Sequence, residues 1–340
     1  MPPLGSQLMK REEHVAILGQ GYAVPPFIRG NDAPIFDWLK KHSPSGTDLF
    51  DGLKFRRVLA TPEGVVDIMV ESCQNALAQA QLKPEHVDMI LGSGSVSAYI
   101  APNDLTVVHD RLGLPRHCRI MPLNSDYSAF QDGVRLANDL IQCGTIQHAL
   151  VVCGNNWTHF MDYHEPVSLA ASDGAGAVVM GRSADPRHFR LIDWENDTQA
   201  KWYGAFRMVP RPIADGPHGH THAYTKPLMK LDDKTGQEAF QTFGMQVAPQ
   251  VVNNLLKRHG LTGGDITLIP HQTSKTVEDA WNAAIQPARY ISTLAEYADM
   301  VSSTVPVNLA KCHHEIHTKY IVLLGIGMEM HATALLLERG

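Results

Sequence analysis

His271 and Asp299 are the two residues whose types and positions best suit acid–base chemistry. His271 follows the apolar segment Ile266–Pro270, so we expect it to stand at the end of a buried strand, where a held imidazole can act as a general base. Asp299 precedes a Ser/Thr-rich stretch and a helix predicted to begin near Pro306. A carboxylate in such a loop could orient the imidazole and stabilise its protonated form. A structural histidine and a plain turn aspartate are the alternatives.

The segment Pro122–Gly144 holds the second candidate site. It is typical of a strand end, a sharp polar turn and an amphipathic helix, which is where many enzymes carry a nucleophile, and its turn offers Tyr127 and Ser128 but no cysteine. The helix is predicted by apolar residues three and four positions apart and by a glycine suited to a C-terminal cap: Phe130, Val134, Ala137, Leu140, Ile141 and Gly144.

Three polar residues before this helix are candidate N-caps: Asn124, Ser125 and Asp126. The unpaired N–H groups at a helix N-terminus also stabilise a developing negative charge. Capping of the helix without any chemistry is the alternative.

Short strand-like runs alternate with helical segments along the chain, which predicts an α/β fold with mixed sheets. Helices are expected near residues 64–81, 104–112, 237–259 and 277–284. The segments "HALVVCGNN" and "AGAVVMGR" resemble "KYIVLLGIG" and "ATALLLE", so each half of the chain ends in a pair of buried strands. We infer an internal duplication, with halves 1–183 and 184–340 around a pseudo-twofold axis that brings the polar ends of distant strands together.

Composition narrows the classes of function. A net charge of −6 gives no broad basic field, so neither nucleic acid nor an anionic membrane is expected as a partner. There is no apolar run of transmembrane length and no signal-peptide pattern, which predicts a cytoplasmic protein. The five scattered cysteines fit neither a disulfide framework nor a CxxC site, and Cys73 and Cys153 are expected in the core.

Two histidine-rich segments could ligate a metal. One contains His218, His220 and His222, and the other is "CHHEIH", which begins at Cys312. Neither segment has a recognisable partner pair of ligands, so solvated or hydrogen-bonded histidines are the main interpretation, and we expect no metal or other cofactor.

Several segments occur in the order found in one known family: "GLKFRRVLATPE", "CGTIQHALVVCGNN", "ASDGAGAVVMG", "GLTGGDITLIPHQTS" and "YIVLLGIG". Asp173–Ala177 and Pro270–Gln272 are the most specific of these matches. Over nearly its whole length the chain resembles the thiolase superfamily, specifically its ketoacyl-ACP synthase III branch. The resemblance implies a five-layered α-β-α-β-α fold with internal duplication, generally as a homodimer, and thioester substrates carried by coenzyme A or an acyl carrier protein.

The same resemblance implies roles for single residues. It places the family's base histidine at His271 and its second polar partner, usually Asn in decarboxylating members, at Asp299. The position of the nucleophilic cysteine falls on Tyr127. Ser274 stands where an asparagine is usual, and Met328 lies in the turn that supplies a backbone N–H to the oxyanion hole.

Two further residues are candidates for substrate binding. Trp38 matches the tryptophan that stacks on the adenine of coenzyme A in the family. Ser128 is a second candidate nucleophile, because a tyrosine pKa of about 10 leaves little phenolate at neutral pH. One helical residue turns a side chain by roughly 100°, however, so we expect Ser128 to point away from the position of the family's cysteine.

These observations predict a ketosynthase III-like acyltransferase of specialised metabolism. It would move an acyl group from a coenzyme A or carrier-protein thioester directly to a nucleophilic acceptor, with a His271–Asp299 general-base dyad and no cysteine acyl-enzyme. The alternative is a non-catalytic ketosynthase-like subunit, in which Tyr127 blocks the site and an active homologue is the partner.

Overall fold

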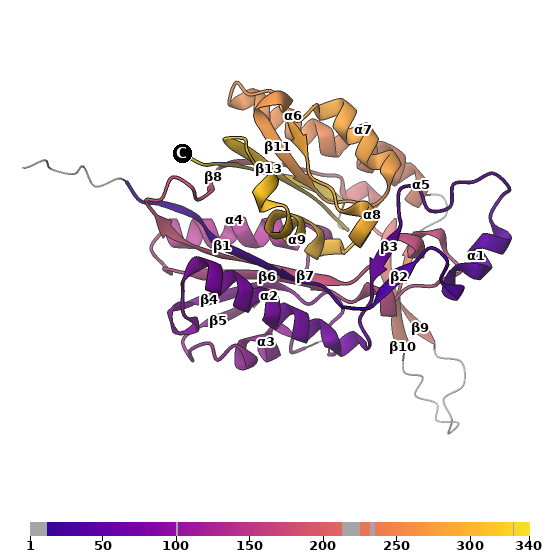
Figure 1. The fold of residues 1–340 in the computed structure, drawn as a ribbon, viewed down its shortest axis with the longest axis horizontal. Helices are drawn as coiled ribbons and strands as arrows, with labels where there is room; N and C mark the ends of the chain where they lie inside the picture. Colours follow the sequence, from indigo (N-terminus) through magenta and orange to yellow (C-terminus); the bar gives the residue numbers. More distant parts are fainter. Residues whose placement is uncertain (1–11, 100, 213–224, 232–234, 329) are drawn as a thin grey trace, which may run out of the picture.

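The computed structural model describes residues 12–99, 101–212, 225–231, 235–328 and 330–340 (Figure 1). Among these residues, the first half of the chain contributes five strands to the large sheet: β1 (His14–Ala23), β4 (Met89–Ser93), β5 (Arg119–Pro122), β6 (Ala149–Asn155) and β7 (Gly174–Ser183). The second half contributes five more strands to that sheet: β8 (Arg190–Thr198), β11 (Ile266–Pro270), β12 (Arg289–Tyr290), β13 (Tyr320–Gly327) and β14 (His331–Glu338).

The two sets of strands have the same order, which shows the internal duplication. The order is β1-β7-β6-β4-β5 in the first set and β8-β14-β13-β11-β12 in the second. In both sets the first three strands are antiparallel neighbours and the remaining pairs are parallel. The sets meet where Ala16 of β1 pairs with Arg190 of β8.

Helices complete five layers, α-β-α-β-α, as the family resemblance implied (Figure 1). Helices α4 (Ala129–Gln142) and α9 (Thr304–Lys311) lie between the two sets of strands. The outer layers contain α2 (Val65–Ala80) and α3 (Leu105–Arg111) on one side, and α6 (Ala248–Arg258) and α7 (Lys275–Ile285) on the other. The shorter elements are α1 (Asp37–His42), α5 (Thr235–Ala239), α8 (Leu294–Tyr297) and two small sheets, β2 (Ile28–Gly30) with β3 (Phe55–Arg57) and β9 (Phe206–Pro212) with β10 (Thr225–Leu231).

The central helix α4 forms as its apolar spacing predicts. Phe130, Val134, Ala137 and Ile141 are buried in one core cluster with residues of both halves, and Leu140 packs against it. Gly144 has φ of 72°, the left-handed conformation expected of a C-terminal cap.

The predicted N-caps of α4 are wrong. A short 3-10 turn, η4 (Asp126–Ser128), separates Asn124 and Ser125 from the helix, so the residue before α4 is Ser128, and it makes no side-chain cap hydrogen bond. The Ser125 hydroxyl donates instead to the Asp132 carboxylate at 2.5 Å. Turning of the chain at η4 therefore moves the polar residues away from the helix N–H groups.

The helix expected over residues 237–259 is interrupted. A π-helical segment, η8 (Phe240–Val247), separates α5 from α6. Apolar residues recur at similar spacings in α and π helices over so short a segment, so the hydrophobic pattern does not distinguish them.

Cysteine and histidine positions bear on the remaining expectations. Cys73 and Cys153 are buried, as predicted for core residues. His218, His220 and His222 lie outside the described residues. Among the described residues, which include the segment that begins at Cys312, no group of three or more His, Cys, Asp or Glu side chains is arranged to hold a metal ion. None of the helices described in the structure is long and apolar enough to span a membrane.

Candidate active site

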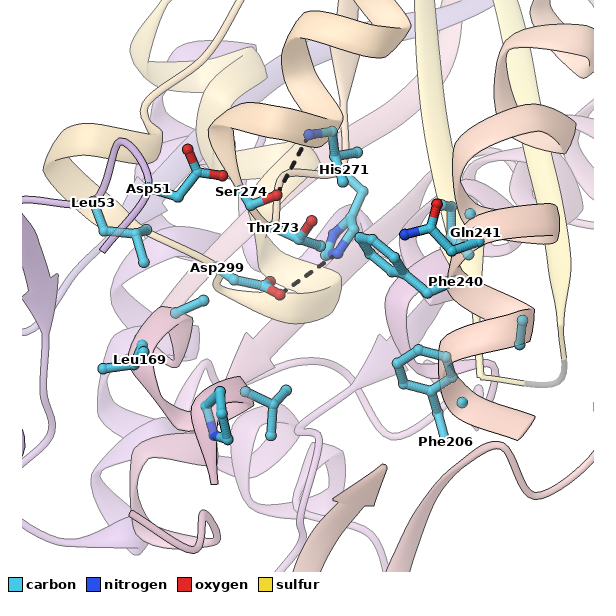
Figure 2. A pocket seen from close by; sticks show the side chains of 18 of the residues that line it. Asp51, Leu53, Leu169, Phe206, Phe240, Gln241, His271, Thr273, Ser274 and Asp299 are labelled. Carbon is cyan, nitrogen blue, oxygen red and sulfur yellow. Dashed lines mark hydrogen bonds and ion pairs between the residues drawn. The ribbon is translucent and has the colours of Figure 1, made fainter. Parts of the chain in front are cut away.

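A cavity of about 780 Å³ lies where segments from both halves of the chain converge (Figure 2). Its lining includes Tyr127 from the first half and His271 and Asp299 from the second. Figure 2 shows Leu53 and Leu169 on one side of the His271–Asp299 pair and the π segment η8 on the other. The predicted proximity of the three polar residues is therefore found, although their roles in chemistry stay predictions.

His271 is held at the end of the buried strand β11. Its backbone N–H donates to the carbonyl of Leu324 on β13 at 2.7 Å, which extends the sheet by one residue beyond Pro270. The residue is buried, and burial lowers the pKa of the imidazole from 6.5 to about 3, with a backbone interaction to Val301 opposing the shift only in part. The imidazole is therefore neutral at physiological pH.

Asp299 lies beside His271 in the loop before α9. Its Oδ2 is 3.6 Å from His271 Nε2, which is longer than a hydrogen bond. The backbone N–H of Val301 donates to Asp299 Oδ1 at 2.7 Å. Even so, burial dominates and raises the pKa of the carboxyl from 3.8 to about 7.

These shifts change the charge pattern expected from the sequence. An ionised Asp299 was expected to stabilise a protonated His271, but removal of both groups from water disfavours both charges. The sequence shows the two residue types and not the surrounding apolar mass that sets this penalty. The pair consequently favours a neutral His271 imidazole and a protonated Asp299 carboxyl.

Gln272 connects the strand of His271 with the loop of Asp299. Its amide nitrogen donates to the carbonyl of Ala298 at 2.6 Å, and its amide oxygen accepts from the backbone of Thr293 and the side chain of Asn308, both at 3.1 Å. All these atoms are buried, so the network has few alternatives to its present geometry. The "PHQ" motif was the only signal for it in the sequence.

Tyr127 fills the position beside the imidazole. Its ring packs edge-to-face on His271, with ring centroids 4.9 Å apart, and on Trp157 at 5.5 Å. Burial raises the pKa of its hydroxyl well above 10, and the carboxylates of Asp299 and Asp126 add to the shift. Tyr127 is therefore a protonated hydrogen-bond donor at neutral pH, and none of the five cysteines lines the cavity.

Ser128 faces away from the cavity, as its position along the helical turn predicted. Its hydroxyl lies 2.5 Å from His331 Nε2, donates to the carbonyl of Ser125 at 3.1 Å and is 3.3 Å from the Asp132 carboxylate. The side chain is fully buried and does not line the cavity. Its contacts are those of a structural serine.

Of the other predicted residues, Ser274 and Met328 line the cavity and Trp38 does not. Ser274 also caps α7, where its hydroxyl accepts from the N–H of Val277 at 3.4 Å (Figure 2). Trp38 lies on α1 with 43% of its surface exposed, and its ring stacks on His42 with centroids 4.2 Å apart.

The chain is similar to known proteins in both sequence and fold. A family model for 3-oxoacyl-[acyl-carrier-protein (ACP)] synthase III matches residues 121–200. The β-ketoacyl-[acyl-carrier-protein] synthase III of Neisseria gonorrhoeae is 24% identical over 264 residues, which are 76% of this chain and 78% of that protein. The solved structure of FabH, the 3-oxoacyl-(acyl carrier protein) synthase III of Pseudomonas aeruginosa PAO1, has a TM-score of 0.79 at 22% identity and covers 96% of this chain and 98% of its own.

The fold is that of the thiolase-like ketoacyl-ACP synthase III proteins. The solved structure of the priming β-ketosynthase of the R1128 polyketide biosynthetic pathway is also similar, with a TM-score of 0.80 at 20% identity, and covers 96% of this chain and 97% of its own. Similarity to ketoacyl-ACP synthase III in both sequence and fold supports a condensing enzyme that transfers acyl groups.

The "DGAGA" motif, which the ketoacyl-ACP synthase III resemblance highlighted, has a structural position here. Asp173 is buried, and its carboxylate accepts from the backbone N–H of Leu59 at 2.9 Å and from both the backbone and the hydroxyl of Thr158. Burial raises its pKa to about 6. The motif joins the start of β7 to two loops near the cavity and does not line it.

Sequence reasoning missed most of the apolar lining. Phe206 on β9, Met229 on β10, Phe240 and Phe243 on η8, and Trp281 on α7 all line the cavity. Phe240, Phe243 and Trp281 lie in segments with the pattern of ordinary helices, and Met229 lies in a stretch whose sequence is typical of a long loop but which forms β10. These residues come together only through the packing of elements far apart in the chain. No motif in the sequence pointed to them.

Proposed function

We propose that the protein is an acyltransferase of the ketosynthase III type that moves an acyl group from a thioester directly to a nucleophilic acceptor. The observation that carries this proposal is the buried His271–Asp299 pair, 3.6 Å apart, at an apolar cavity large enough for an acyl group. Coenzyme A or an acyl carrier protein is the proposed donor, and the similarity to synthase III proteins supports this choice.

In the proposed reaction, the pair acts as one base. The acceptor's N–H or O–H loses its proton to the pair as the acceptor attacks the thioester carbonyl, and the proton resides on Asp299, whose pKa of about 7 exceeds that of His271. Collapse of the tetrahedral intermediate breaks the C–S bond, and the pair returns the proton to the departing sulfur. No acyl-enzyme forms, so ping-pong kinetics are not expected.

Tyr127 is proposed as a hydrogen-bond donor in this reaction. Its hydroxyl stays protonated because its pKa is raised well above 10, which makes it a poor nucleophile and a good donor. A donor aimed at the oxygen of the tetrahedral intermediate stabilises the charge that develops there. Backbone N–H groups near Met328, which lines the same cavity, are the proposed second source of such bonds.

The charges of the lining support transfer without decarboxylation. Among the described residues, the cavity is lined by the carboxyl groups of Asp48, Asp51 and Asp299 and by no Lys or Arg. A malonyl carboxylate would find no cationic partner there. We therefore propose a neutral acyl group and an amine or alcohol acceptor, in specialised metabolism, with a cytoplasmic location and a homodimeric state as further proposals.

A non-catalytic subunit is the second candidate. The ring of Tyr127 favours it, because the family resemblance assigns this residue the position of the nucleophile and the ring packs on both His271 and Trp157. In this role the chain would pair with an active homologue as a heterodimer, and the buried pair would be a remnant of an earlier activity.

Turnover of acyl thioesters by the purified protein separates the two candidates. Octanoyl-pantetheine and a panel of primary amines and alcohols are incubated with wild type, His271→Ala and His314→Ala, where His314 is exposed and outside the cavity. The enzyme proposal expects release of thiol by wild type and by the control, and a loss of at least a hundredfold in His271→Ala. Intact mass after the reaction should show no adduct. Equal rates in all three proteins, or a stable adduct on Tyr127, would reject direct transfer by the pair.

A further inference from the structure

One wall of the cavity is built from the π segment η8 and the helix α7. Phe243 and Gly244 of η8, Trp281 of α7 and Met330 after β13 all line it. Phe243, Trp281 and Met330 are almost fully buried within the core cluster of the second half. This wall is apolar and backed by packed core, so its shape is already formed without ligand.

The π segment is fixed in place by Trp281. The indole N–H donates to the carbonyl of Gly244 at 2.9 Å. A π turn is wider than an α turn and shifts which carbonyls find partners within the helix. The hydrogen bond from Trp281 supplies a partner to one of these carbonyls and holds the widened turn against α7, which keeps the space beside it open.

Gly244 leaves room that a side chain would occupy. A Cβ built at this position meets only Phe240 Cδ2, at 3.7 Å, which is ordinary contact, and the backbone φ is not in the left-handed region. Neither strain nor crowding therefore requires glycine here, although glycine is unfavourable inside a helix. The missing side chain enlarges the cavity at the wall.

We propose that this wall binds the apolar body of the acyl group, and that the preferred substrate carries an alkyl chain of about eight carbons or more rather than acetyl. This inference rests on the proposed function, because it assigns the acyl half of the same substrate. An acetyl group is too small to cover the apolar wall formed by Phe243, Trp281 and Met330. The wall carries no charged side chain among its described residues, so a chain that ends in a carboxylate is excluded.

Binding of S-alkyl pantetheine thioethers tests the inference without turnover. These compounds contain the arm shared by coenzyme A and carrier proteins but cannot transfer an acyl group, so a failure of the proposed reaction leaves this test intact. Dissociation constants are measured by calorimetry for the S-ethyl and S-octyl compounds with wild type, Gly244→Leu and Gly264→Leu. Gly264 is the matched control: it is exposed, its Cβ would meet only Thr262 Oγ1 at 3.7 Å, and it does not line the cavity.

The expected result is a chain-length preference that depends on Gly244. Each buried methylene should tighten binding about threefold to fourfold, so wild type and the control should bind the S-octyl compound at least a hundredfold more tightly than S-ethyl. Gly244→Leu should lose most of this difference and leave S-ethyl binding within about twofold. Gly244→Ala should have a melting temperature at or above that of wild type, and it should lose part of the difference in affinity between the two compounds. Equal binding of both compounds by wild type, or equal weakening of both by Gly244→Leu or Gly244→Ala, would overturn the proposal.

Discussion

The pH dependence of acyl transfer follows from the burial of the His271–Asp299 pair. Burial raises the pKa of Asp299 to about 7 and lowers that of His271 to about 3, so one proton is taken up near neutral pH, and the carboxylate takes it. A group with a pKa of about 7 is roughly one-tenth ionised at pH 6 and nine-tenths at pH 8. We expect kcat/KM to rise about tenfold between these values and to level off above pH 8.

Asp299→Asn tests this assignment because the amide keeps the shape of the side chain but cannot accept the proton. The rise between pH 6 and pH 8 should disappear, and kcat/KM at pH 8 should fall at least a hundredfold. Asp279→Asn is the control, since Asp279 is an exposed carboxylate on α7 paired with Lys275, and it should keep the full pH profile.

Thermal stability gives an independent readout of the same pKa. A carboxyl whose pKa is raised on folding binds its proton more tightly in the folded state, so its ionisation destabilises the fold progressively as the pH rises from about 4 to 7. Asp299→Asn should therefore increase the melting temperature more at pH 8 than at pH 4. A pH–rate limb near 7 that persists in Asp299→Asn, or a lower melting temperature of this variant at pH 8, would refute the reasoning.

Three further changes test the geometry of the site and its supports. Tyr127→Cys should place a thiol beside the buried imidazole. After incubation with octanoyl-pantetheine, its intact mass should show an octanoyl adduct that wild type lacks. An unmodified variant would mean that the position does not face the thioester. Gln272→Leu should lower the free energy of unfolding in urea by about 3 kcal/mol, because it leaves the carbonyl of Ala298 and the amide of Asn308 buried without their partner. A loss below about 1 kcal/mol would contradict the stabilising role of this network. Gly92→Ala should give no folded protein on expression, because Gly92 has φ of 135° and a Cβ there would lie 1.7 Å from the carbonyl oxygen of Val152; circular dichroism of a soluble variant like that of wild type would contradict this.

Local patterns in the sequence predicted much of the architecture. Helices α2 and α4 and the strand that ends at His271 have periodicities that are set by neighbours in the chain, and the repeated strand pairs indicated the duplication. The proximity of Asp299 and Tyr127 to the imidazole was also predicted, since the ends of corresponding strands meet near a pseudo-twofold axis.

Features that depend on three-dimensional packing could not be predicted. The pKa values of His271 and Asp299 are set by apolar atoms from many distant segments, and the sequence alone led to the opposite charge state for the pair. The π segment η8 has the apolar spacing of an ordinary helix, so its wider turn, which needs the indole of Trp281 as a partner, was not visible. The polar residues at 124–126 have cap-forming side chains, yet the turn η4 decides where they point.

The sparse pairing between β1 and β8 bears on the order in which the molecule folds. Because the two sets of strands meet through Ala16 and Arg190 and are otherwise joined mainly by the central helices, each set can organise its own sheet before docking. The tyrosine ring comes from one of these units and the imidazole and carboxylate from the other, so no fragment that contains a single unit can hold the assembled trio. The three side chains would then come together only in the last stage of folding, after the spectroscopic signals of helix and sheet are complete.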